Sequence, residues 1–169
     1  GLSVQVYTLR SEHNWGMGDF SDLQDTVIRA AGLGIHFLVL NPLHLLDADH
    51  PENCSPYSPM DRRFLNPLYI DPRKVEDFSE NQELQGLMAT PDIQSELLEL
   101  RSKPQVDYTG VTRLKYDLFN RMFGFFKTNH LEQSTPRAAD FYNYIDGKGE
   151  PGQVFSNNQA DKNQFTLEH

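Results

Sequence analysis

Cysteine is almost absent from this chain, which has a single one, Cys54, among 169 residues. One cysteine cannot form an intramolecular disulfide, and this favours a reducing compartment, so we expect a cytoplasmic protein. No apolar run approaches the ~20 residues that a membrane-spanning helix needs, and no signal peptide opens the chain. The sequence therefore predicts no membrane partner.

Basic charge is also scarce. Lys and Arg together number 15 against 24 Asp and Glu, which gives a formal net charge of −9, and the basic residues are scattered along the chain. Binding to nucleic acid needs a clustered basic face that neutralises phosphates. We therefore expect no nucleic-acid partner, and an acidic surface suits a protein that handles neutral or polar small molecules.

The first quarter of the chain carries strand and helix signals in alternation. Residues Leu2–Leu9 (LSVQVYTL) alternate as a strand does, and His36–His44 (HFLVLNPLH) is the continuous apolar run typical of a strand buried on both faces. Between them, Asp19 is placed to cap a helix that Gly32 and Gly34 end. The apolar side chains at helical spacing on one face of this helix are Phe20, Leu23, Val27, Ile28 and Ala31. A strand, a helix and a buried strand in succession predict a βαβ unit with parallel strands.

The second half of the chain has helix signals only. Thr90–Pro91 is a cap followed by proline at the first helical position, and predicts a helix to about Leu100. A longer helix is predicted to open at Asp107–Thr109, and Thr135–Pro136 opens a third. The predicted apolar stripe of the longer helix is Val111, Leu114, Leu118, Met122 and Phe125, with Phe119 and Phe126 beside it.

These patterns predict an α/β fold that contains only the opening part of a (β/α)8 barrel, or TIM barrel, followed by a helical subdomain. A closed barrel needs about 250 residues, and this front supplies two of its eight strands, so we expect an incomplete barrel. The expected parts are the βαβ unit with its long loops in residues 1–75, a helical insertion in 76–150, a frayed tail in 151–166, and an expression-tag remnant in 167–169.

Between the two halves lies the stretch SPYSPMDRRFLNPLYIDP, Ser55–Pro72, which contains four prolines. Proline fixes its own φ and restricts the residue before it, so the stretch predicts a stiff, shaped loop that is neither helix nor regular strand. Ligands of parallel β/α sheets bind beyond the carboxyl ends of the strands, where this loop follows the second strand. Tyr57 in the loop is thus placed either to contact a ligand or to cover the sheet end with its hydroxyl bonded to backbone.

Four blocks in order, VQVYTLRSEHNWGMGDFSDL, FLVLNPLH, SPYSPMDRRFLNPLYIDP and VDYTGVTRLK, resemble the amylomaltases, the bacterial 4-α-glucanotransferases. The resemblance runs from about Leu2 to about Lys127. It implies a (β/α)8 catalytic barrel of the α-amylase clan that transfers segments of α-1,4-glucan between maltooligosaccharides by a retaining mechanism. It implies no cofactor, and maltooligosaccharides as the partners.

The resemblance also implies that this chain holds a donor-sugar wall and no catalytic residue. The family's aspartate nucleophile, glutamate acid/base and second aspartate lie on later strands, and the nucleophile's Arg-x-Asp-His type of motif is absent here. Tyr57 matches the family tyrosine that packs beside the sugar next to the scissile bond, and Ser55 matches a position close to that sugar's hydroxyls. We therefore expect an N-terminal enzyme fragment that is inactive alone. The alternatives are a non-catalytic carbohydrate-binding module and a structural or assembly domain.

Other polar and aromatic residues have a structural interpretation that we prefer. Asn41 and His44 could touch a ligand, but residues at strand ends more often bond the adjacent loop. Trp15 could stack on a sugar, but its place between a strand and a helix favours packing. Arg62 and Arg63 are expected to form ion pairs with Asp47, Asp49 or Asp61, worth little if exposed.

We expect no metal site. His44, His50 and Cys54, with Asp47 and Asp49, match no closed zinc spacing. The phenylalanine-rich stretch YDLFNRMFGFF is either core or a surface that faces the remainder of a barrel. Because an incomplete barrel leaves apolar faces uncovered, we expect this chain by itself to self-associate.

Overall fold

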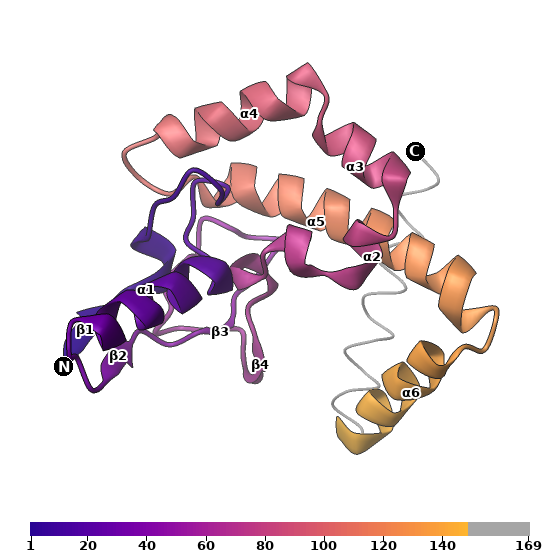
Figure 1. The fold of residues 1–169 in the computed structure, drawn as a ribbon, viewed down its shortest axis with the longest axis horizontal. Coiled ribbons are helices and arrows are strands. Elements are labelled where there is room, and N and C mark those ends of the chain that lie inside the picture. Colours follow the sequence, from indigo (N-terminus) through magenta and orange to yellow (C-terminus); the bar gives the residue numbers. More distant parts are fainter. Residues whose placement is uncertain (149–169) are drawn as a thin grey trace. The chain divides into compact units, whose positions relative to one another are not determined.

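The computed structural model describes residues 1–148, drawn in colour in Figure 1, in two compact units. The first unit is Gly1–Phe119 and the second begins at Asn120. The predicted tail, 151–166, and tag remnant, 167–169, lie outside the described residues. The division into a barrel part, 1–75, and a helical part, 76–150, stays a prediction.

The first unit opens with a parallel strand pair. β1 (Leu2–Val4) pairs in parallel with β2 (Leu38–Leu40), with Ser3 opposite Val39, and α1 (Phe20–Gly32) connects the two strands. Figure 1 shows α1 lying alongside this pair at the indigo end of the chain. The predicted strand–helix–strand unit with parallel strands is confirmed.

The first strand is shorter than predicted. It stops at Val4, and the chain then turns through a 3-10 helix, η1 (Val6–Thr8). The backbone N–H of Val6 donates to the side chain of Asn41 at 2.9 Å instead of to a neighbouring strand. The predicted strand Leu2–Leu9 is therefore wrong beyond Val4, because a side chain takes the hydrogen bond that would continue the ladder.

The prediction that the second strand is buried on both faces is also wrong. Val39 is 54% exposed and Phe37, just before β2, is 62% exposed. The apolar face of α1 is open as well, since Val27 and Ile28 are exposed. The physical reason is that β1 and β2 alone form this sheet in residues 1–148, so there is little for these apolar side chains to pack against.

Helix α1 begins as predicted. The Asp19 side chain accepts from the backbone N–H of Ser21 at 2.9 Å and of Asp22 at 3.2 Å. The Asp22 side chain in turn accepts from the N–H of Asp19 at 2.9 Å. This reciprocal capping box satisfies N–H groups that the first helical turn leaves without partners. The cap position of Asp19 is thus confirmed.

The proline-rich stretch contains a strand that the sequence analysis excluded. β4 (Asp61–Leu65) pairs antiparallel with β3 (His44–Leu45), and an irregularity in register separates the His44–Leu65 pair from the Leu45–Asp61 pair. The strand is possible because DRRFL lies between prolines and contains none of them. The rest of the stretch holds two 3-10 turns that each start at a proline, η2 (Pro67–Tyr69) and η3 (Pro72–Lys74).

Helices make up the remainder of the first unit. They are α2 (Glu76–Ser79), α3 (Gln82–Met88), α4 (Pro91–Ser102) and the start of α5 (Tyr108–Phe126). The first two were not predicted. Thr90 stands at the cap of α4 as expected, but its hydroxyl donates backwards to the carbonyl of Leu87 at 2.7 Å and caps nothing.

Helix α5 carries the core of the first unit on one stripe. Val111, Leu114 and Leu118 are buried, as their spacing predicted. Further along, Met122 of the predicted stripe and Phe126 beside it are buried, whereas Phe125 is only half-buried.

The second unit contains the end of α5, a π-helical segment η4 (Lys127–Leu131) and α6 (Pro136–Lys148). Its core is aromatic: the Phe126 ring packs edge-to-face on Phe141, with centroids 5.4 Å apart, and lies 5.3 Å from the ring of His130. Within this unit Phe126 of the phenylalanine-rich stretch is core, one of the two alternatives predicted, whereas Phe123 is exposed.

Candidate functional site

The β3–β4 hairpin presents the loop of residues 46–60, which contains both predicted sugar-binding residues. Backbone hydrogen bonds close the base of the loop: Met60 donates to the carbonyl of Leu45, and Asn66 donates to that of Leu43, both at 2.9 Å. The hairpin therefore holds the two ends of the loop together, and the loop projects from it.

Tyr57 stands at the tip of a turn in this loop. Ser55 accepts from the backbone N–H of Ser58 at 3.2 Å, so Pro56 and Tyr57 are the two central residues of the turn. Proline pre-sets φ at the first central position. The Tyr57 side chain is 67% exposed, and Ser55 is exposed beside it. The structure thus places the two residues in one turn, with the ring turned outward.

A second turn of the loop is held by a histidine–carboxylate pair. The Asp47 carboxylate accepts from the N–H of Asp49 at 3.0 Å and lies 3.0 Å from Nδ1 of His50. The hydrogen bond to His50 lowers the pKa of Asp47, and the same bond raises the pKa of His50. Both side chains are exposed, so the pair shapes the turn and adds little stability.

At the far end of the loop, Arg63 forms an ion pair with Asp61, as expected from the sequence. Its guanidinium contacts both carboxylate oxygens of Asp61, with the shortest distance 2.6 Å, and these bonds lower the pKa of Asp61 to about 2. Arg63 is exposed and Asp61 is half-buried, and the pair joins two residues of one strand, so it stiffens β4 locally.

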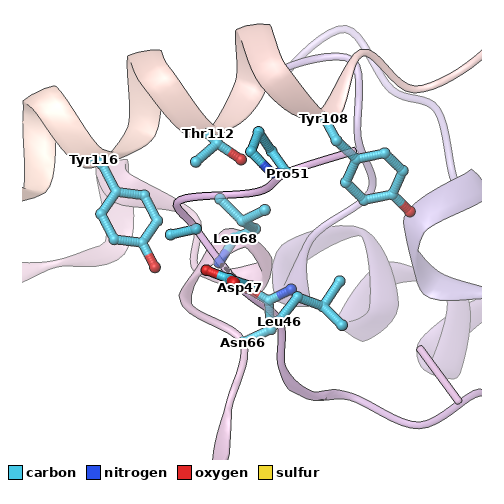
Figure 2. Close-up of a pocket in the computed structure, with 9 residues that line it drawn as sticks. Leu46, Asp47, Pro51, Asn66, Leu68, Tyr108, Thr112 and Tyr116 are labelled. Atoms are coloured by element: carbon cyan, nitrogen blue, oxygen red, sulfur yellow. Dashed lines mark hydrogen bonds between the residues drawn. The ribbon is translucent and has the colours of Figure 1, made fainter. Parts of the chain in front are cut away.

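A small cavity lies between this loop and α5. Figure 2 shows Tyr108, Thr112 and Tyr116 projecting from α5 toward the loop. The other lining residues come from the loop and from the start of η2; they are Leu46, Asp47, Ala48, Pro51, Asn66 and Leu68. The volume is about 10 Å³, the space of one water-sized sphere, so a sugar ring does not fit there.

Buried polar groups line this cavity. Nδ2 of Asn66 and Oγ1 of Thr112 have no hydrogen-bond partner in the part of the chain that the structure describes. Burial, followed by the charges of Asp49 and Asp47, raises the pKa of Tyr116 to about 12, and burial also raises the pKa of Tyr108. The cavity therefore keeps its tyrosines neutral and joins the loop to α5 without offering a ligand site of molecular size.

Of the two strand-end residues, Asn41 has the structural role that we preferred. Asn41 accepts from Val6 and donates to the carbonyl of Pro42 at 2.8 Å and to the hydroxyl of Tyr69 at 3.4 Å. It therefore joins η1, the end of β2 and η2. His44 lies in β3, and its Nδ1 is buried without a partner within residues 1–148. Neither side chain is placed on the exposed tip of the loop.

Trp15 is buried, at 2% exposure, which agrees with packing rather than stacking on a sugar. Among the described residues, no group of three or more His, Cys, Asp and Glu side chains is gathered to hold a metal ion. Nor is any helix within residues 1–148 long and apolar enough to cross a membrane.

Lys115, near the loop, is a buried charged residue that was not predicted from the sequence. It is fully buried, at 0% exposure, and its Nζ donates to the carbonyls of Leu68 at 2.6 Å and Ile70 at 2.7 Å. It also lies 5.8 Å from the Trp15 ring centroid. Burial lowers the pKa of Lys115 to about 8, and nearby carboxylates such as Asp19 oppose that shift. Lys115 fixes η2, the segment that follows β4, to α5.

One sequence signal could have found Lys115. It lies four residues after Val111 and three before Leu118, so it occupies the apolar stripe of its helix. A lysine on such a stripe means either that the helical period was assigned wrongly or that the lysine is buried and has partners for its charge. Here the partners are backbone carbonyls of a turn that the sequence analysis treated as an irregular loop.

A parallel strand pair joined by a helix, with an aromatic loop projecting from a hairpin after the second strand, defines this chain as an α/β protein with an exposed loop site. The structure is similar to the crystal structure of amylomaltase from Corynebacterium glutamicum, with a TM-score of 0.68 and 28% identity, over 89% of this chain and 21% of that one.

Sequence comparison gives the same result. The family model described as 4-alpha-glucanotransferase matches residues 4–166, and this chain belongs to that family. It is 38% identical over 151 residues to a 4-alpha-glucanotransferase of Haemophilus influenzae, over 89% of this chain and 22% of the relative. It is 40% identical over 77 residues to one of Mycobacterium tuberculosis, over 41% of this chain and 11% of the relative. The chain thus spans about a fifth of the first of these relatives, and the resemblance in the four sequence blocks is confirmed.

Proposed function

We propose that this chain is the N-terminal part of a 4-α-glucanotransferase and supplies a wall of its donor-sugar site. The complete enzyme would move segments of α-1,4-glucan between maltooligosaccharides by a retaining mechanism, on a (β/α)8 barrel to which β1 and β2 contribute. Family membership and the parallel strand pair support this proposal. A cytoplasmic location remains our expectation for it.

In this proposal Tyr57 packs the face of its ring against the glucose unit beside the scissile bond, and Ser55 bonds that sugar's hydroxyls. The observation that carries it is the exposed ring of Tyr57 on a turn closed by a hydrogen bond. Pyranose rings offer C–H faces to aromatic side chains and hydroxyls to polar ones. A ring held in place before binding loses little entropy when the sugar arrives, which is preorganisation.

We further propose that the chain alone is catalytically inactive. Retaining glycoside chemistry needs two carboxyl groups about 5–5.5 Å apart on either side of the glycosidic bond. The sequence has no Arg-x-Asp-His type of motif for the nucleophile. The role of this chain in the reaction is therefore to bind and orient the donor and to exclude water beside it.

The first experiment is a titration of the 169-residue chain with maltotriose, followed through tyrosine ring signals in NMR spectra. We expect Tyr57 signals to shift at millimolar sugar and Tyr57→Ala to abolish the response of the loop. Tyr142→Ala, which removes an exposed tyrosine of the second unit, is the matched control and should leave it unchanged. No response of the wild-type chain at millimolar maltotriose would contradict the proposed wall.

The second experiment uses the complete enzyme. An aromatic contact is worth about 0.5–1.5 kcal/mol beyond its buried area, so Tyr57→Ala should lower kcat/KM for transfer from maltotriose roughly two- to tenfold. Hydrolysis should rise relative to transfer, since water enters where the ring stood, and Tyr57→Phe should retain most of the activity. Unaltered kinetics in Tyr57→Ala would remove Tyr57 from the site.

The exposed ring is equally compatible with a carbohydrate-binding module that performs no chemistry. The gene sequence beyond Thr166 separates the two functions. A continuing frame with an Arg-x-Asp-His block and later Glu and Asp residues supports the transferase, and a stop codon there supports the module.

A further inference from the structure

A second cavity of the first unit is lined by none of the residues of the Tyr57 loop. It has a volume of about 290 Å³ and is bounded by the segment after η1, by η3 and by helices α2 to α5. This volume is at the lower end of the range for small-molecule sites. Its lining is mixed: Phe78, Leu97 and Leu118 are among the apolar side chains, and the polar ones include two arginines, Arg73 and Arg101.

Arg101 is held rigidly but keeps donors available. Its Nε donates to the backbone carbonyl of Asn14 at 2.6 Å, which fixes the plane of the guanidinium. Within the described residues, neither terminal nitrogen of Arg101 makes a hydrogen bond, and no carboxylate forms an ion pair with it. A guanidinium with two unused terminal N–H₂ groups is the geometry that receives a carboxylate or a phosphate.

Arg73 contributes a second, partly neutralised charge. Its Nε and one terminal nitrogen bond the carboxylate of Asp71 at 3.0 and 2.8 Å. Burial works against the charge of Asp71, but the bonds from Arg73 and Ser21 outweigh it and hold the pKa of Asp71 below its ordinary value. Arg73 therefore keeps its orientation, and its second terminal nitrogen makes no hydrogen bond among residues 1–148.

The two arginines repel each other. Burial lowers the pKa of Arg101, and the charge of Arg73 lowers it further. Two fixed cations that line one cavity are stabilised by an anion placed between them. A pair of arginines in one cavity contrasts with the rest of the chain, which carries a formal net charge of −9. One carboxylate, Glu12, lines the cavity as an exposed side chain and opposes an anion there.

We propose that this cavity binds a small organic anion. Its carboxylate or phosphate group lies between Arg73 and Arg101, and its apolar body packs against Phe78, Leu97 and Leu118. The charged end gains hydrogen bonds from preoriented donors, and the apolar end leaves water for walls that are already in place. This site is independent of the proposed sugar wall, since the two share no residue.

The chain carries its own reporter for this site. Trp15 is its single tryptophan and lines the cavity. We would titrate the 169-residue chain with phenyl phosphate, benzoate, inorganic phosphate and benzyl alcohol and follow Trp15 fluorescence. Phenyl phosphate or benzoate should bind at least tenfold more tightly than inorganic phosphate and benzyl alcohol. If phenyl phosphate binds more tightly than benzoate, the site prefers a phosphate group; the reverse order indicates a carboxylate. Equal binding of benzyl alcohol, or no response to either aromatic anion at millimolar concentration, would overturn the proposal.

Three variants separate the site from a general effect of charge. A charge-assisted hydrogen bond to an anion is worth about 1.5–3 kcal/mol, so Arg101→Gln should weaken phenyl phosphate binding tenfold or more. Arg29→Gln removes an exposed arginine in the last turn of α1 and should change nothing. Glu12→Gln should strengthen binding roughly two- to fivefold, because it removes a repelling charge at an exposed position. If Arg101→Gln fails to fold, the Glu12→Gln result decides, and unchanged affinity there refutes the proposed site.

Discussion

The buried lysine makes a prediction about how stability changes with pH. Lys115 titrates near pH 10.5 in an unfolded chain, whereas burial lowers its pKa to about 8 in the folded protein. Between these two values the unfolded chain binds more protons than the folded one. The unfolding free energy rises with pH wherever the unfolded chain binds more protons than the folded one. The protein should therefore become more stable as the pH rises through this window.

The size of the effect follows from the shift. A lowering from 10.5 to about 8 corresponds to about 3 kcal/mol over the whole window. About half of this, roughly 1–2 kcal/mol, is gained between pH 8 and pH 9.5. Ionisation of buried tyrosines acts in the opposite direction, because the raised pKa of Tyr116 favours unfolding once free tyrosine loses its proton near pH 10. The upper limit of pH 9.5 keeps that opposing effect small.

The assay is urea unfolding at several pH values from 8 to 9.5, followed by fluorescence of the buried Trp15. The wild-type chain should gain about 1–2 kcal/mol across the range. Lys115→Met removes the titrating group and should abolish that gain, while tyrosine effects remain in both proteins and cancel in the difference. Lys74→Met, which changes an exposed lysine, should retain the wild-type slope.

Equal slopes in the wild-type chain and Lys115→Met would refute the reasoning. That result would mean that the pKa of Lys115 in the folded protein equals its value in the unfolded chain, because its partners offset the effect of burial. The two carbonyls of η2 and the charge of Asp19 would then stabilise the ammonium far more than their geometry indicates.

Three other changes test the fold. Asp19→Ala should lower the unfolding free energy by about 1 kcal/mol through loss of the α1 cap, and Asp19→Asn, which can still cap, should lose less; urea unfolding measures both. Gly16→Ala should destabilise by more than about 1 kcal/mol because Gly16 has φ +80° and a Cβ would collide with a backbone carbonyl, whereas Gly32→Ala, with open space around it, should be neutral or stabilising in the same assay. Light scattering should detect self-association of the chain at high concentration through the exposed face that includes Val39, and Val39→Ser should reduce it; a clean monomer would contradict this.

The sequence predicted the βαβ unit because its signals are local and redundant. The cap at Asp19 predicts its helix and the apolar run predicts its second strand, so two separate signals indicate the same unit. Burial was predicted less well, since Val39 belongs to a sequence typical of a covered strand and is exposed here. Amphipathic patterns report what a surface is suited to contact. They do not report whether the contacting segment is among the residues at hand.

The proline-rich stretch shows a different limit. Its prolines were taken to make the whole stretch a stiff loop; Pro56 does stand in the turn with Tyr57, but the same reasoning was extended to Asp61–Leu65, which forms β4. Proline restricts itself and the residue before it, so its influence ends within a few residues. The helices α2 and α3 were missed because they are too short to show a period.

The rigidity of the Tyr57 loop depends on more than its prolines. Proline stiffness sets the shape of a turn, but it cannot fix where the turn lies relative to the sheet. That placement comes from the β3–β4 hairpin at the base of the loop and from Lys115, which binds the carbonyls of Leu68 and Ile70 just beyond β4. A buried charge is costly unless it is paired. The chain keeps one at the junction between α5 and the segment that carries the loop, where three donors on a single ammonium can satisfy several backbone carbonyls at once. A methionine at position 115 would fill the same space and satisfy neither carbonyl, so the lysine is better explained by the positioning of this segment than by stability alone.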